Sequence, residues 1–361
     1  MRTEILTGKL SGHAVRIATE LNLHQSYARA MRGVQEQTEG ARLWYFLYVC
    51  DHHFSIAYGR PPVIHDDASI VKHERFLGLP GITEADIRLH SQVSLFIILT
   101  EVYNAFGPDI EQALSEDDLL RLQHFSLALD SYRTKWEPRL APNDYIANYP
   151  AKGVGLHYNF AKLQVSSLAL RGIEPSSVSA LTTNRRALAN VAICCALSTL
   201  QIVLDEPDIR NSIVGVPIYL HTMITYSAVF LLKIQHKWKA FRLETDTVFI
   251  GVLVKRIIAM LKEGNAGERH LSCHIATGLS KMLDRFTPWE AQERLPSETV
   301  SADTRNPPVV QCLQPIYDMG PVEGLFGHDK TTGFYDEHYF PMGFFDILSS
   351  TQFDPGLWDQ S

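Results

Sequence analysis

Apolar side chains recur at intervals of three and four residues along most of this chain, which is the spacing of a buried helix face. The set nearest the N-terminus consists of Leu10, Ala14, Ile17, Ala18 and Leu21. We expect these residues to form the buried face of a first helix. A polar run at residues 35–40 separates this helix from the next apolar stretch.

Residues 41–57 are apolar on most sides of a helix, a pattern typical of a helix at the centre of a core. The apolar side chains of this stretch are Leu43, Trp44, Phe46, Leu47, Val49, Cys50 and Phe54. The helix is expected to end at residues 58–62, because Gly59 suits a helix end and Pro61 cannot continue the hydrogen-bonded backbone.

Helix-start signals mark the next two helices. Thr83, with Asp86 three residues later, predicts a helix over 83–105. Ser115, followed by three acidic residues at the positive end of the helix dipole, predicts a helix over 115–136. Further apolar periods predict helices at 157–170, 176–204, 213–239, 245–261 and 269–287. Since no alternating strand pattern competes, we expect an all-α, multi-helix fold over residues 1–289.

The composition changes after residue 289, which predicts a linker at 290–316 and a different kind of segment at 317–361. Acidic and aromatic residues alternate in that last segment, with frequent Gly and Pro, so it is expected to be disordered when free. This pattern is typical of an activation segment that docks in a hydrophobic groove of a coactivator. A C-terminal arm packed on the helical body is the alternative. The residues expected to make the docking contact are Phe340, Phe344, Phe345, Ile347 and Leu348.

Charge and cysteine content narrow the function further. The 361 residues include 40 acidic and 33 basic side chains, a net charge of -7 that disfavours binding of nucleic acid by the body of the domain. Five cysteines without a CxxC pair indicate neither a disulfide framework nor a metal site. The apolar stretch at 213–234 contains Pro217, His221, Thr222, Thr225 and Ser227, so we expect a buried core helix and no membrane span.

Two ordered sequence blocks resemble a known family. Residues 12–24, which read GHAVRIATELNLH, are similar to a "G-x-A-x-R-x-A…L-x-L-H" helix, with Arg16 as its basic residue. Residues 39–48 and then 51–66 are similar to "E-x-x-R-R-x-W-W-x-x-Y" and "D-x-x-x-S-x-x-x-G-R-P-x-x-I-x-D". Both motifs are those of the fungal-specific transcription factor domain, the middle homology region of zinc binuclear cluster regulators. The resemblance is greatest to regulators of secreted proteases and of aromatic amino acid or weak acid responses.

The resemblance implies a helical regulatory domain of an activator that controls RNA polymerase II transcription in the nucleus, with shuttling to the cytoplasm left open. It also implies coactivators and the transcription machinery as partners, a homodimer or a heterodimer with another zinc-cluster regulator, and a small-molecule effector. Family members carry an N-terminal cluster of six cysteines that holds two zinc ions. This sequence lacks that cluster. We therefore expect no cofactor in this chain and no direct DNA binding by it.

The second block also suggests a structural role for its residues. The matching residues are Asp51, Ser55, Gly59, Arg60, Pro61 and Asp66. Asp51 and Ser55 lie one helical turn apart, and Arg60 follows the helix end. We expect a bidentate Asp51–Arg60 ion pair that clamps the corner at residues 59–61 against the helix. These residues are interpreted as structural and not as catalytic.

A metal-dependent enzyme is the alternative function. His52, His65 and Asp66 include the His-Asp dipeptide with which all-helical phosphohydrolases hold divalent metal and activate water. However, His65 and Asp66 follow a Pro-Pro loop, where that chemistry needs ligands fixed on helices, and a convincing distant Asp is missing. The sequence also lacks GxSxG, HExxH, P-loop and GxGxxG motifs. A regulator without enzymatic activity is therefore favoured.

Overall fold

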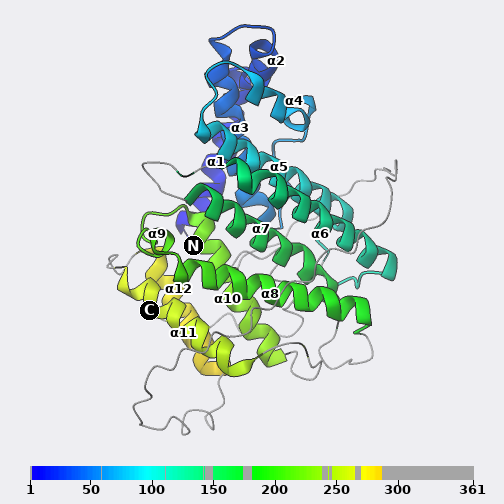
Figure 1. Ribbon diagram of the computed structural model, residues 1–361, viewed down its shortest axis with the longest axis vertical. Helices are drawn as coiled ribbons and strands as arrows, with labels where there is room; N and C mark the ends of the chain where they lie inside the picture. The colour runs from blue at the N-terminus through cyan, green and yellow to red at the C-terminus, as the bar shows by residue number, and fades with distance from the viewer. Residues whose placement is uncertain are drawn as a thin grey trace. The chain divides into compact units, whose positions relative to one another are not determined.

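The computed structural model describes residues 2–57, 59–109, 111–140, 142, 149–173, 181–237, 243, 246–264 and 270–286, with side chains from residue 10 onward except at residues 57, 237 and 286 (Figure 1). All regular elements among these residues are helical, which confirms the predicted all-α fold. The first part of the chain forms α1 (Arg2–Glu20), the 3-10 turn η1 (Leu23–Gln25), α2 (Ser26–Ala30), α3 (Gln37–Ala57), α4 (Ala68–Val71) and the 3-10 turn η2 (His73–Gly78).

The helix-start signals at Thr83 and Ser115 are both confirmed. The hydroxyl of Thr83 accepts a hydrogen bond from the amide of Asp86, whose carboxylate in turn accepts from the amide of Thr83, and α5 (Glu84–Phe106) follows. Ser115 and Asp118 form the same reciprocal arrangement at the start of α6 (Glu116–Trp136). Each pair satisfies backbone N–H groups that the first helical turn leaves without a partner.

The second part of the chain is also helical. Its elements are η3 (Glu137–Arg139), α7 (Tyr149–Ser167), η4 (Leu168–Leu170), α8 (Thr183–Asp205), α9 (Pro207–Arg210), α10 (Ile218–Lys237), α11 (Thr247–Glu263) and α12 (Leu271–Phe286). Helix α7 begins earlier than the predicted residue 157, because Pro150 stands in its first turn, where a missing N–H costs no helical hydrogen bond. Helix α8 begins later than predicted, after Thr182 as its N-cap.

Helix α7 occupies the centre of the helical body and packs against α6 and α8. It is buried on nearly all sides, from Gly153 to Ser167, with Phe160 and Leu163 fully enclosed. Helix α10 is similarly enclosed and packs against α8 and α12. These helices form one continuous apolar core with α3, α5 and α6.

Helix α8 is long and apolar enough to cross a membrane by length and composition alone, with a mean hydropathy of 2.0 in its most apolar window and 56% of that window buried. Since α8 packs between α7 and α10, it serves as a core helix of the described domain. The apolar stretch that the sequence singled out, 213–234, lies mostly in α10, whose side chains are also buried.

Two predictions about buried faces were wrong in part. In α1, Val15 and Ala18 are buried against the domain, whereas Leu10 and Ile17 are exposed, as is Leu21 just after the helix. Helix α3 was expected to be central, and it does bury Tyr45 and Tyr48 completely. Its opposite side, however, leaves two large apolar residues open to solvent: Leu43 is 48% exposed and Phe46 is 54% exposed. That side borders the groove described next.

Candidate functional site

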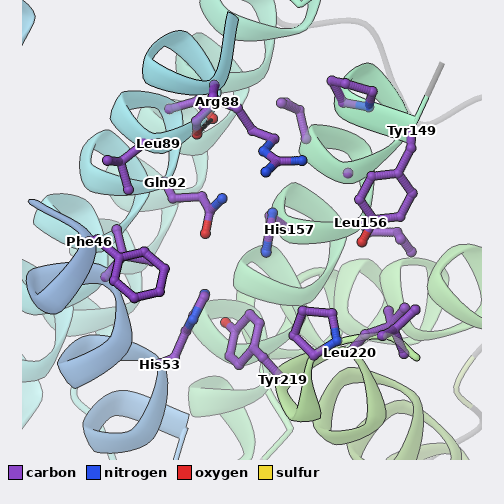
Figure 2. A pocket seen from close by; sticks show the side chains of 18 of the residues that line it. Phe46, His53, Arg88, Leu89, Gln92, Tyr149, Leu156, His157, Tyr219 and Leu220 are labelled. Carbon is purple, nitrogen blue, oxygen red and sulfur yellow. Dashed lines mark hydrogen bonds between the residues drawn. The ribbon is translucent and has the colours of Figure 1, made fainter. Parts of the chain in front are cut away.

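A groove of about 1320 Å³ opens between α3, α5, α7 and the segment that runs from α9 into α10 (Figure 2). A concave space between helices, mostly apolar with a few polar groups, is the usual form of a small-molecule site. The family resemblance implied a small-molecule effector, and the sequence did not locate its site. This groove is the candidate.

One face of α3 forms a wall of the groove. Its lining residues recur at helical spacing and are Glu39, Arg42, Leu43, Phe46, Val49, Cys50 and His53. Leu43 and Phe46 are exposed because they border this open space rather than a neighbouring helix. The apolar character that suggested a central helix is therefore explained by a core on one side and a groove on the other.

Ion pairs fix the rim of the groove. Arg42 on α3 contacts both carboxylate oxygens of Asp86 on α5, at 2.7 and 2.9 Å, and also pairs with Glu39 at 2.5 Å. Burial alone would raise the pKa of Asp86, but hydrogen bonds from Arg42 and Thr83 outweigh it and hold the pKa below its ordinary value. On the opposite rim, Asp208 pairs with Lys152 at 2.8 Å.

Arg88 is the remaining charged residue of the lining. Its side chain leaves α5 and points into the groove toward His157, as Figure 2 shows, while Gln92 follows one turn later on the same helix face. Among the described residues, no carboxylate lies within 4 Å of the Arg88 guanidinium. Its charge acts on His157, where it adds to the lowering of the pKa by burial, and on Tyr149, where it offsets part of the rise in pKa that burial causes. The groove thus contains one cation without a counterion among those residues.

Three rings from three helices meet at the base of the groove. His53 of α3 stacks on Tyr219 of α10, with ring centroids 3.8 Å apart and planes 26° from parallel. His157 of α7 lies beside both rings, 5.7 Å from Tyr219 and 6.0 Å from His53 (Figure 2). The three rings form a flat, apolar and polarisable surface that suits contact with another planar group.

Burial keeps both histidines of this ring cluster neutral. It lowers the pKa of His157 to about 4, and the positive charge of Arg88 lowers it further. It also lowers the pKa of His53 well below its ordinary value, with His157 as the next cause. Neither ring contributes charge at neutral pH. The Nε2 atom of His53 is buried without a hydrogen-bond partner among the described residues, which leaves a polar atom at the groove base for a bound molecule.

The corner after α3 is clamped, but not by the predicted ion pair. One carboxylate oxygen of Asp51 accepts hydrogen bonds from the backbone amides of Val63 at 2.7 Å and Ile64 at 2.9 Å, and the other faces the hydroxyl of Ser55 at 3.5 Å. The Arg60 side chain is exposed. Burial explains why Asp51 accepts hydrogen bonds from these amides. Backbone N–H groups that are shielded from water need an acceptor within the protein, whereas the exposed Arg60 side chain can be hydrated.

Gly59 allows the chain to make this corner. Its φ of 63° is in the left-handed region, and its amide donates to the carbonyl of Ile56, while the amide of Arg60 donates to that of Ser55. Both bonds satisfy carbonyl groups that the end of α3 would otherwise leave open. Pro61 continues the corner at the surface.

The other predicted motif residues lie apart from the groove. Asp66 accepts a hydrogen bond from the hydroxyl of Tyr48 at 2.6 Å, and burial raises its pKa. Arg16 is exposed on α1 and pairs with Glu20 at 2.9 Å. The predicted activation residues, Phe340, Phe344, Phe345, Ile347 and Leu348, lie outside the described residues.

The enzyme alternative finds no support in the geometry. The Nδ1–H of His52 donates to the carbonyl of Tyr48 at 2.8 Å, and burial lowers the pKa of His52 to about 4. His65 is exposed on the loop. Within the part of the chain that the structure describes, no three His, Cys, Asp or Glu side chains are placed to hold one metal ion.

Sequence reasoning missed the groove residues Arg88, Gln92 and His157. In α5, Arg88 and Gln92 are polar residues four apart and therefore share one helix face, which is a signal for a polar site beside a core. His157 gives no such signal, because only the packing of α7 beside α3 and α10 brings it to His53 and Tyr219.

The described residues form an all-helical domain with a groove between its helices. A family model described as "Transcriptional activator of proteases prtT middle domain" matches residues 8–288, and the chain belongs to this family. The chain is 53% identical over 302 residues to a protein of Emericella nidulans named "Transcriptional activator of proteases prtT". These matches confirm the resemblance to fungal transcription regulators.

The alignment with the Emericella nidulans protein covers 82% of this chain and 46% of that protein. The chain therefore spans about half the length of that relative. No solved structure matches the chain.

Proposed function

We propose that this chain is the regulatory portion of a fungal transcription activator that controls RNA polymerase II transcription of protease genes in the nucleus. The family match over residues 8–288 carries this proposal, and the name of the Emericella nidulans relative supplies the link to proteases. The role is that of a regulator and not of an enzyme. The groove between α3, α5, α7 and α10 serves as its effector site.

The proposed partners follow from the same assignment. Coactivators or the transcription machinery contact residues 317–361, where acidic and aromatic side chains alternate. The chain pairs with a second copy of itself or with another zinc-cluster regulator. No membrane takes part.

A reporter experiment tests the proposal. The full chain, fused to a heterologous DNA-binding domain, is expected to raise transcription of a reporter in fungal cells. Removal of residues 317–361 should abolish the increase, and Phe344→Ala combined with Phe345→Ala should reduce it severalfold, because the aromatic anchors of such segments carry most of the contact energy.

The matched control is Phe326→Ala combined with Phe353→Ala, which removes two aromatic residues of the same segment outside the expected docking contact. Equal loss from both double variants would show that the contact is not where we place it. A full-chain fusion that accumulates in the nucleus and leaves the reporter at its basal level would contradict the activator assignment.

A further inference from the structure

We propose that the groove binds a small organic monocarboxylate with an apolar or aromatic body, whose carboxylate pairs with Arg88. This inference rests on the proposed function only in naming that molecule as the effector. The binding itself follows from the charges, the contacts and the shape of the groove.

The charged residues that line the groove provide the first argument for an anionic ligand. The charged residues of the lining are Glu39, Arg42, Asp86, Arg88 and Asp208. Four of them have partners of opposite sign, because Arg42 pairs with Glu39 and Asp86, and Asp208 pairs with Lys152. Arg88 has none among the described residues. A half-buried guanidinium in a mostly apolar groove is stabilised by an anion, and it fits a carboxylate with two parallel hydrogen bonds.

The number of charges then limits the ligand to one carboxylate. His157 lies beside Arg88 in the groove and His53 lies farther along it (Figure 2), but both are neutral at pH 7, because burial lowers the pKa of each. A phosphate dianion or a dicarboxylate would bring a second negative charge without a second cation to meet it. Gln92, on the same face of α5, offers amide N–H groups as additional neutral donors (Figure 2).

The walls of the groove determine the rest of the ligand. The stack of His53 on Tyr219, with His157 beside it, presents ring surface to the groove. Phe46 and Leu89 face it from α3 and α5, and further apolar lining comes from Leu156, Val216 and Leu220. A hydrocarbon or aromatic body gains free energy by covering this surface, roughly in proportion to the apolar area removed from water.

Matched acid and amide pairs test the inference on the purified full chain. The probes are 3-phenylpropanoate, indole-3-propanoate and 4-methylpentanoate, each compared by calorimetry with its primary amide, which has the same shape and no charge. We expect at least one acid to bind roughly tenfold or more tightly than its amide, as a charge-assisted contact in a partly buried site provides. If no acid binds more tightly than its amide, the inference is wrong.

Variants assign the preference to Arg88. Arg88→Gln should remove the difference between acid and amide, and Arg88→Lys should retain part of it. Phe46→Ala should weaken acid and amide alike, because it removes only wall surface. Arg256→Gln on α11, whose residue is exposed and pairs with Asp205, is the control and should keep the wild-type preference. An acid preference that survives in Arg88→Gln would overturn the assignment.

The two proposals can fail separately. The acid–amide comparison on the wild-type chain needs no variant to fold and no transcription. A missing acid preference would leave the reporter result unchanged, and a silent reporter fusion would leave the measured binding in place.

Discussion

Asp51 near the end of α3 holds Ile64 in the following loop, because its carboxylate accepts the Ile64 amide at 2.9 Å. The neighbouring amide of Val63 donates to the same oxygen at 2.7 Å. Asp51 is 2% exposed, and its burial raises the pKa of the carboxyl, while the two amides and Ser55 lower it in part. The side chain thus joins the helix to the chain beyond the corner through two backbone amides.

Two substitutions can distinguish the Asp51–amide contact from the predicted Asp51–Arg60 ion pair as the interaction that holds the corner. Asp51→Ala should destabilise the domain by about 2–3 kcal/mol, because two buried amides lose their acceptor. Arg60→Ala should cost less than about 1 kcal/mol, since its side chain is exposed. Urea unfolding followed by circular dichroism gives both values. The reverse order of the two costs would restore the Asp51–Arg60 clamp that the sequence predicted.

The Arg42–Asp86 pair should couple α3 to α5 at the groove rim. Asp86 is 3% exposed and Arg42 contacts both of its oxygens, so we expect a coupling free energy of about 1.5–3 kcal/mol between them. A double-mutant cycle with Arg42→Met and Asp86→Asn, read from unfolding free energies, measures it. Arg16→Met with Glu20→Gln is the exposed control and should give at most about 0.5 kcal/mol. If the unfolding free-energy changes of Arg42→Met and Asp86→Asn add without any coupling, the pair would contribute to the contact between α3 and α5 only by packing.

Buried histidines should make the domain less stable in mild acid. Burial lowers the pKa of His52 to about 4, of His73 to about 4 and of His90 to about 3, all from an ordinary value of 6.5. Between pH 6.5 and 4 the unfolded chain binds protons that the folded chain does not. The free energy of unfolding therefore falls as pH falls, by up to about 1.4 kcal/mol per pH unit for each histidine.

Urea unfolding at pH 7.5, 6.5 and 5.5 checks this slope. His52→Met removes one of the rings with a lowered pKa, so its stability should decrease less between pH 6.5 and 5.5 than that of the wild type. A wild-type stability that is flat or rises toward pH 5.5 would contradict the buried, neutral state of these rings.

Local signals in the sequence predicted the helices better than they predicted the groove. The capping residues Thr83 and Ser115 act within four residues of chain, so their effect is independent of tertiary structure. The exposure of Phe46 depends on where α5 and α7 pass, which no local pattern contains. The same limit explains why the sequence suggested an Asp51–Arg60 ion pair. Asp51 could pair with any nearby donor, and only the folded loop brings the amides of Val63 and Ile64 to it.

Gly172, at the turn after α7 and η4, should tolerate no side chain. Its φ is 65°, and a Cβ atom there would lie 2.3 Å from the backbone nitrogen of Ala113 and 2.6 Å from the carbonyl oxygen of Glu111. The neighbouring Arg171 donates to the carbonyl of Phe106 at 2.7 Å and of Gln112 at 3.1 Å, so the same loop is held from two sides.

Gly172→Ala is therefore expected to cost about 3 kcal/mol or more, since backbone strain and a backbone clash add in a loop that cannot move away. Gly155→Ala is the matched control, because Gly155 lies within α7 and a Cβ there meets nothing within 4 Å. Replacing a helical glycine by alanine should stabilise the domain by about 0.5–1 kcal/mol. Thermal unfolding of the two variants beside the wild type distinguishes them, with the melting temperature lower for Gly172→Ala and higher for Gly155→Ala. Similar shifts in both variants would mean that the loop at 111–113 does not press on Gly172 in solution.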